Sequence, residues 1–283
     1  MHPEARSVGG TGIRLNRLAP SRRVVIGSLS VTALLVLWQA LSSTGAVSAV
    51  MLPGPLGLVH KASYLAGFDG NGQFQMERDA VLTLARLLSG FLTAALLAIP
   101  VGIAAGLVRW IGRALAPFLA IFMSIPALAL VPILMLLTGL GNATDFTIVV
   151  ITAFVPIAMY VYDGVRLIDP KFFWTARSFG ASRGEIIRHV ILPATVVPIV
   201  AGFRMGMGYA WRSLVATESL TALSGGLGYT IFQAAEFFDT QTIYLYMIVI
   251  AVLGFAIESV FRALERRTAV RWGFLSAQEA SDG

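Results

Sequence analysis

The chain has 283 residues, of which 57% are hydrophobic and only 13% are charged. An ordinary soluble domain carries roughly 25% charged residues, so the composition argues against a soluble globular protein and equally against a disordered one. The net charge is +6, from 21 basic and 15 acidic residues, and there is no cysteine. Disulfides, thiolate metal sites and cysteine nucleophiles are therefore excluded. What remains is a polytopic membrane protein.

Stretches without charge predict the membrane spans, because a spanning helix needs about 20 mostly apolar residues. Such stretches recur along the whole chain. They predict an all-α membrane protein with six transmembrane helices. The predicted helices cover residues 24–42, 80–108, 114–138, 146–166, 193–217 and 241–264.

The distribution of Lys and Arg predicts the orientation. Most of the 21 basic residues fall in the tails and in alternate loops, which by the positive-inside rule places both termini in the cytoplasm. We therefore expect cytoplasmic tails at 1–23 and 268–283 around a transmembrane domain at 24–267. This placement also explains the basic charge without nucleic acid, since these loops face anionic membrane lipid.

The first apolar stretch has an alternative interpretation. Arg22 and Arg23 before it are typical of a twin-arginine export signal, and Val47–Ala49 resembles a cleavage site. The stretch is longer than the usual signal core of about 7–15 residues, and five more predicted spans follow it. These features favour a retained anchor.

Shorter elements are expected between the spans. Residues 56–67 predict an interfacial helix and residues 229–238 a short amphipathic one, while Gly67 to Gly72 and Ser224 to Gly228 have the composition of loops.

The loop at 168–192, between the fourth and fifth predicted helices, is rich in local signals. Asp169-Pro170 supplies an N-cap acceptor and a first-turn proline, and Gly180 supplies a left-handed stop ten residues later. Ser182 then begins an S-x-x-E capping box. The loop is therefore predicted to contain a short helix, a glycine corner and a second short helix.

The first of these loop helices is predicted to be amphipathic. Phe172, Ala176 and Phe179 form an apolar stripe, with Lys171 and Arg177 off it. Taken alone, this pattern is also typical of a helix that rests on lipid headgroups. The second short helix is predicted to run toward Pro193.

The spacing in this loop resembles the EAA loop of ABC-importer permeases. That family's pattern is Glu-Ala-Ala, three residues, Gly, nine residues, Ile, one residue and Leu-Pro. Ala176, Gly180, Val190, Leu192 and Pro193 match it, with valine in place of isoleucine. The start departs from it, because Trp174 stands where Glu is usual and Thr175 where the first Ala is usual.

The resemblance implies that the loop docks into a groove of a cytoplasmic ATPase and transmits its closure. Without the usual Glu, docking would rest on shape, apolar contact and the arginines of the loop. The residues expected to couple the two proteins are Trp174, Ala176, Arg177, Phe179, Gly180, Ala181, Arg183, Leu192 and Pro193.

The resemblance extends over about residues 30–272 and is strongest to the nitrate/sulfonate/taurine branch of these permeases. It implies a bacterial inner-membrane homodimer that works with two ATPase subunits, which bind ATP and Mg, and with an extracytoplasmic solute-binding protein. The expected substrate is taurine or another aliphatic sulfonate; nitrate, bicarbonate and a thiamine-precursor pyrimidine remain alternatives. The stretches that carry the resemblance are Leu52–Pro55, Thr83–Arg86, Gly90-Phe91, Ile125–Pro132, Gly202–Arg204, Trp211, Glu218, Gly226–Gly228 and Ala263–Arg267.

The motif content also indicates that ATP hydrolysis and transport belong to separate polypeptides. The sequence has no G-x-x-x-x-G-K-[ST] phosphate loop, so ATP hydrolysis is expected on a partner. An ion-coupled secondary transporter, the alternative class, usually carries acidic residues in mid-span, whereas Asp163, Glu218 and Glu258 lie near the ends of the predicted spans. His60 and His189 have no carboxylate at fixed spacing, so neither catalysis nor a metal site is expected.

The substrate path is expected to involve charges in the fifth span. Arg204 and Arg212 either attract a passing anion or form structural ion pairs, and Arg212 is the better functional candidate because the resembled family is not basic there. Arg212 could alternatively pair with Glu218 or with another acidic residue. Glu218 and Pro126 complete the candidate path, with Pro126 and Pro132 expected to kink the third span. Gly202 and Gly206 are expected to serve close helix packing.

Overall fold

The computed structural model describes residues 20–44, 48, 50–66, 74–221 and 225–273, and every regular element in these ranges is helical. The chain divides into two compact units, residues 1–56 and 57–283. The elements are α1 (Pro20–Ser43), α2 (Pro55–Leu65), α3 (Gln75–Leu107), α4 (Arg109–Ser124), α5 (Ala127–Thr138), α6 (Asn142–Arg166), α7 (Pro170–Ser178), α8 (Arg183–Ile186), the π-helical turn η1 (Ile187–Ile191), α9 (Leu192–Thr221), α10 (Leu227–Glu236) and α11 (Thr240–Arg271).

Within these ranges, five helices are long and apolar enough to cross a membrane, and a sixth is obtained if the bent pair α4–α5 counts as one span. The all-helical fold class is confirmed. The charge-free stretches located the spans within a few residues at most ends. The largest differences are at the third and fifth spans.

The core of the second unit is a layer in which α6 lies between α3 and α9. Small residues let α3 and α6 approach closely, because an added Cβ at Gly90 would lie 2.6 Å from Val149 Cγ1 and one at Gly106 would lie 2.5 Å from Val165 Cβ. Close backbone approach at small residues is the usual way for membrane helices to pack. The small residues follow one face of α3 at every fourth position: Gly90, Ala94, Ala98, Gly102 and Gly106.

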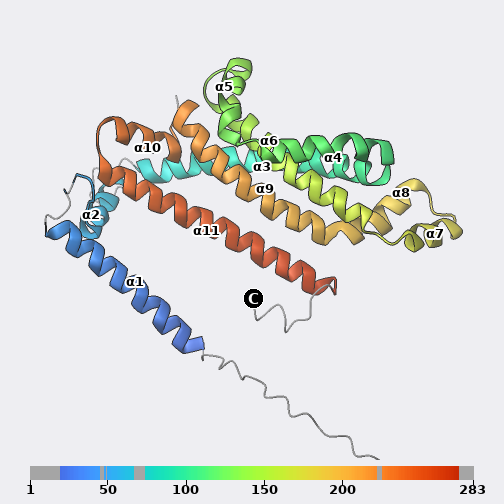
Figure 1. Ribbon diagram of the computed structural model, residues 1–283, viewed down its shortest axis with the longest axis horizontal. Coiled ribbons are helices and arrows are strands. Elements are labelled where there is room, and N and C mark those ends of the chain that lie inside the picture. Colours follow the sequence, from blue (N-terminus) through green and yellow to red (C-terminus); the bar gives the residue numbers. More distant parts are fainter. Residues whose placement is uncertain (1–19, 45–47, 49, 67–73, 222–224, 274–283) are drawn as a thin grey trace, which may run out of the picture. The chain divides into compact units, whose positions relative to one another are not determined.

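The predicted packing role of Gly202 and Gly206 is confirmed on the other side of α6. A Cβ at Gly202 would lie 2.9 Å from Tyr160 Cβ, and one at Gly206 would lie 2.9 Å from Ile157 Cγ1. Helix α11 packs along α9, as Figure 1 shows for the red and orange ribbons, and α10 contacts both. Far less of α11 than of α6 is buried.

The third predicted span is not one kinked helix. It is broken at Ile125-Pro126 into α4 and α5, whose axes differ by 103°. Both residues have extended backbone, because proline lacks an amide donor and pushes the residue before it out of the helical region. Pro132 lies within α5 without interrupting it, so the expected kink occurs only at Pro126 and is a complete break.

The second loop helix is also not a separate element. It continues through η1 into α9, giving one helix from Arg183 to Thr221. The amide of Leu192 donates to Ile187 O, five residues back, in the wide π-helical turn. This turn accommodates Pro193, which cannot donate the hydrogen bond of a regular helix. The expectation of a boundary at Pro193 was therefore wrong.

The two short helices expected between spans are present as α2 and α10, while the predicted loop at Gly67 to Gly72 lies outside the described residues. Lys61 of α2 donates to Asp239, the N-cap of α11, at 2.9 Å. Burial acts to raise the pKa of Asp239, but hydrogen bonds from Lys61 and Thr242 outweigh it and lower that pKa below its ordinary value.

Candidate functional site

Helix α7 of the 168–192 loop is capped as the sequence predicts. The Asp169 side chain accepts from the Lys171 amide at 2.9 Å, and Pro170 occupies the first turn. The chain then turns at Gly180, where φ is +78°. The Ala181 amide closes the turn onto Ala176 O at 3.0 Å, so a left-handed glycine directs the chain away from α7.

The next helix starts at the predicted capping box. The Ser182 amide donates to Glu185 Oε2 at 2.7 Å, and the Glu185 amide donates to Ser182 Oγ at 3.3 Å. The two bonds satisfy two amides that the start of a helix would otherwise leave unpaired. The corner between α7 and α8 is thus fixed by local hydrogen bonds.

The predicted apolar stripe of α7 is buried only in part, at Ala176. Phe173 and Ala176 pack against the core, together with Ala181, whereas Phe172 and Phe179 point outward with exposed fractions of 62% and 87%. Trp174 is also exposed, at 64%. Three exposed aromatic side chains on one short segment form an apolar surface of the kind that marks a protein or membrane contact.

The remaining loop residues divide into two groups. Arg177, Gly180 and Arg183 are exposed beside the aromatic side chains. Leu192 and Pro193 lie at the start of α9, beyond the π-helical turn. They belong to the continuous helix and not to the exposed corner.

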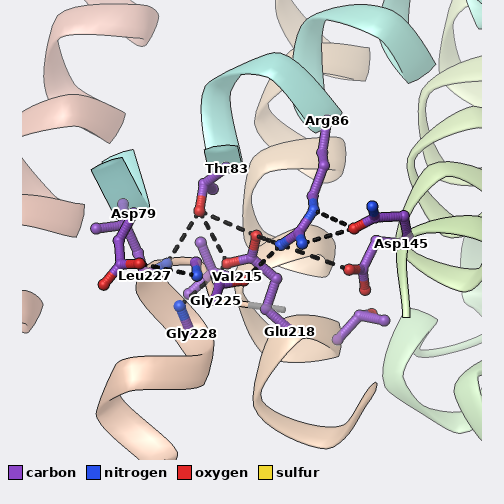
Figure 2. Close-up of polar contacts among 12 residues, drawn as sticks. Asp79, Thr83, Arg86, Asp145, Val215, Glu218, Gly225, Leu227 and Gly228 are labelled. Atoms are coloured by element: carbon purple, nitrogen blue, oxygen red, sulfur yellow. Dashed lines mark hydrogen bonds and ion pairs between the residues drawn. The ribbon is translucent and has the colours of Figure 1, made fainter. Parts of the chain in front are cut away.

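The second candidate site is polar and lies where α3, α6, α9 and α10 meet (Figure 2). It is at the opposite end of α9 from the 168–192 loop. Its centre is Arg86, whose guanidinium donates to Glu218 Oε1 at 2.8 Å and lies 3.6 Å from Asp145 Oδ2. Arg86 also donates to Asn142 Oδ1, at 2.6 and 3.0 Å. All three charged side chains are buried, which makes the bonds between them strong and their loss costly.

This cluster holds the backbone of the turn before α10. Arg86 donates to Gly225 O at 2.8 Å, Thr83 accepts from the Leu227 amide at 3.0 Å, and Glu218 accepts from the Gly228 amide at 3.1 Å. Buried backbone amides need such partners. The polar side chains therefore fix the position of the turn.

Two glycines allow this close contact. Gly226 has φ of +128°, and an added Cβ there would lie 2.6 Å from Glu218 Oε1. A Cβ at Gly228 would lie 2.1 Å from Val215 O. The Gly226-Leu227-Gly228 motif thus has a packing reason, since neither position has room for a side chain.

Glu218 is a site residue that the sequence predicts, but its partners in the cluster are not among the predicted site residues. Asp79, Thr83 and Arg86 are spaced as one face of α3, and this pattern could have suggested a polar helix face. Asp79 extends the cluster by accepting from the hydroxyls of Thr230 and Tyr246, at 2.7 and 2.9 Å. The alternative pair of Arg212 with Glu218 is wrong, because Glu218 binds Arg86 and Arg212 forms no ion pair among the described residues.

The two arginines of the fifth span have different surroundings. Arg204 donates to Glu258 at 2.8 Å and to Glu265 at 2.9 Å, both on α11, so it takes part in structural ion pairs. Arg212 donates to Gly208 O at 2.9 Å, and its guanidinium lies 5.6 Å from the centre of the Tyr209 ring. Both line one pocket of about 270 Å³ between α9 and α11. Pro126 lies elsewhere, in a pocket of about 190 Å³ at the α4–α5 break.

These features define a class of protein: a multi-pass helical membrane protein with an internal polar cluster at one end of its bundle and an exposed aromatic loop at the other. Residues 98–270 match the family described as "Binding-protein-dependent transport system inner membrane component". The chain belongs to this family, and it is therefore a permease component of a transport system.

Three curated relatives place it within the family. The taurine transport system permease protein TauC of Escherichia coli is 32% identical over 247 residues, covering 87% of this chain and 90% of that protein. The putative aliphatic sulfonates transport permease protein SsuC of Bacillus subtilis is 32% identical and covers 87% of each. The nitrate import permease protein NrtB of Synechococcus elongatus is 31% identical and covers 71% of this chain and 72% of that protein.

A solved structure supports the fold. A chain from inward-facing conformations of the methionine ABC transporter MetNI superposes with a TM-score of 0.61 at 19% sequence identity. The match covers 69% of this chain and 96% of that one. The family match and the three curated relatives, in turn, confirm the predicted resemblance to the nitrate/sulfonate/taurine branch of ABC permeases.

Proposed function

We propose that this chain is the permease of an ATP-driven importer for taurine or another small aliphatic sulfonate. The observation that carries the proposal is the 32% identity to both TauC and SsuC across 87% of the chain. Nitrate is the second candidate, because NrtB is nearly as similar.

In the proposed assembly, two copies of the permease pair in the inner membrane with both termini in the cytoplasm. Two ATPase subunits, which bind ATP and Mg, contact the paired 168–192 loops. On the outer side of the membrane, a binding protein delivers the solute to the permease. The exposed side chains of Phe172, Trp174 and Phe179 support ATPase contact at this loop. With Trp174 in place of the usual Glu, this contact would be mainly apolar, flanked by Arg177 and Arg183.

In the proposed path, Arg212 attracts the anionic solute from the pocket between α9 and α11. Arg204 contributes less charge because two glutamates already neutralise it. Glu218 and Pro126 act indirectly in this proposal, Glu218 by fixing the turn before α10 and Pro126 by separating α4 from α5.

The test is uptake by proteoliposomes that contain the permease, its ATPase and its binding protein. Taurine uptake should require ATP and stop when the ATPase carries an inactive catalytic site. Uptake by the permease alone under a proton or sodium gradient would overturn the proposal in favour of a secondary transporter. Thermal shift of the binding protein with taurine and with nitrate then decides between the two solutes.

A further inference from the structure

A basic pocket of about 540 Å³ opens where α3 ends and α4 begins, beside α7. Four arginines line it: Arg109 and Arg113 on α4, Arg166 at the end of α6 and Arg177 near the end of α7. No carboxylate is among its lining residues. Four like charges around one cavity repel each other, so an anion in it would stabilise the arrangement.

The acidic side chains of the adjoining loop are engaged elsewhere. Asp169 caps α7 and lies 3.9 Å from Lys171 Nζ, and Glu185 closes the capping box. Among the described residues, none of the ion pairs includes any of the four pocket arginines. Arg166 alone has a side-chain partner there, donating to the Tyr162 hydroxyl at 2.7 Å.

Helix dipoles explain the positions of only two of the four arginines. Arg166 and Arg177 lie in the last turns of α6 and α7, where a cation is favourable. Arg109 and Arg113 lie in the first turns of α4, where a cation is unfavourable. Val108 gives α4 no side-chain cap, and the first turn has no acidic residue. An external anion would offset the unfavourable charge of Arg109 and Arg113 and would stabilise the uncapped start of α4.

The neighbouring side chains indicate the depth of the pocket. Trp110 is 73% exposed, and Leu107 and Val108 are also exposed. A tryptophan and apolar side chains exposed beside arginines are typical of the membrane–water interface, where basic side chains reach lipid headgroups. These exposed side chains therefore favour a position of the pocket near the lipid headgroups.

We propose that this pocket binds a phosphate group, which joins the start of α4 to α7. Guanidinium groups bind phosphate oxygens with paired, charge-assisted hydrogen bonds. An anionic phospholipid headgroup is the expected source, and a free phosphate is the other source of the same chemistry. Because α7 is the proposed coupling helix, the bound phosphate would also restrain that helix. Only this consequence rests on the proposed function, and the binding itself does not.

The experiment measures retention of phosphatidylglycerol by the purified permease, without ATPase, using native mass spectrometry. The variant is Arg109→Gln/Arg113→Gln. The matched control is Arg267→Gln/Arg271→Gln, which removes two exposed arginines one turn apart on α11, outside the pocket. Losing two charge-assisted contacts should weaken retention about tenfold or more, and the control should bind as the wild type does. Arg109→Lys/Arg113→Lys, which keeps the charge, should retain part of the binding.

Competition separates the two sources. If excess phosphatidylglycerol displaces the retained lipid but millimolar inorganic phosphate does not, the pocket is a lipid site. If inorganic phosphate displaces the retained lipid, the pocket is a free-phosphate site. Equal retention by wild type and Arg109→Gln/Arg113→Gln would overturn the proposal. Failure of ATP-driven uptake, by contrast, leaves the binding result unaffected.

Discussion

The buried pair of Arg86 and Glu218 gives the sharpest stability prediction. Arg86→Met removes the cation that lies 2.8 Å from Glu218 and 3.6 Å from Asp145. Removing one partner of a buried ion pair costs about 3–5 kcal/mol, because the remaining charge stays buried and unpaired. The loss also frees Gly225 O, so the turn before α10 should loosen. A large share of a typical folding free energy of roughly 5–15 kcal/mol would disappear.

The assay is unfolding of the purified permease in mixed micelles, followed by tryptophan fluorescence. Arg78→Met is the matched control: it lies on the same helix, is exposed and makes no ion pair among the described residues. This control should change the free energy of unfolding by less than about 0.5 kcal/mol.

A double variant tests the cause. Arg86→Met/Glu218→Gln removes the unpaired carboxylate but keeps an amide oxygen that can accept from Thr83 and Gly228. It should regain about 2–3 kcal/mol relative to the sum of the single changes. Recovery is incomplete because Asp145 also faces Arg86. Strictly additive losses, or a stable Arg86→Met protein, would refute the argument that the ion pair holds this end of the bundle.

Three further changes test other sites. Gly180→Val should cost about 1–3 kcal/mol of backbone strain at φ +78° without any steric clash. Co-purification of the ATPase should fall with this variant, while Gly180→Asn should retain it. Normal recovery of the ATPase with Gly180→Val would argue against a docking role of the loop. Arg212→Gln should slow uptake about 5–30-fold, equivalent to about 1–2 kcal/mol, with an unchanged melting temperature; unchanged uptake would remove Arg212 from the path. Gly228→Ala should lower the melting temperature, because its Cβ would lie 2.1 Å from Val215 O, whereas Gly184→Ala, with open space around it, should not.

The sequence predicted the helices well because membrane spans are signalled by local composition. The charge-free windows and the local caps at Asp169, Gly180 and Ser182 each depend on a few neighbouring residues, and the structure has them as expected. Proline was less informative. Pro126 breaks a span completely, whereas Pro193 lies in a continuous helix, and the difference comes from a π-helical turn that the proline alone does not signal.

The polar cluster could be predicted only in part. The face formed by Asp79, Thr83 and Arg86 is visible in the sequence, but Glu218 pairs with a residue 132 positions away. Which charges meet depends on how closely α3, α6 and α9 pack. The same limit explains why the sequence indicates Arg212, which lies six positions before Glu218, as a partner and does not indicate Arg86.

The unbroken helix from Arg183 to Thr221 has a mechanical consequence. Its 39 residues form a rod of roughly 58 Å at 1.5 Å per residue. One end begins at the exposed corner, and the other carries Glu218 and Thr221 into the polar cluster. This helix packs along its middle against α6 through Gly202 and Gly206. Glu218 also accepts from the Gly228 amide, so a single continuous helix connects the exposed corner to the turn before α10.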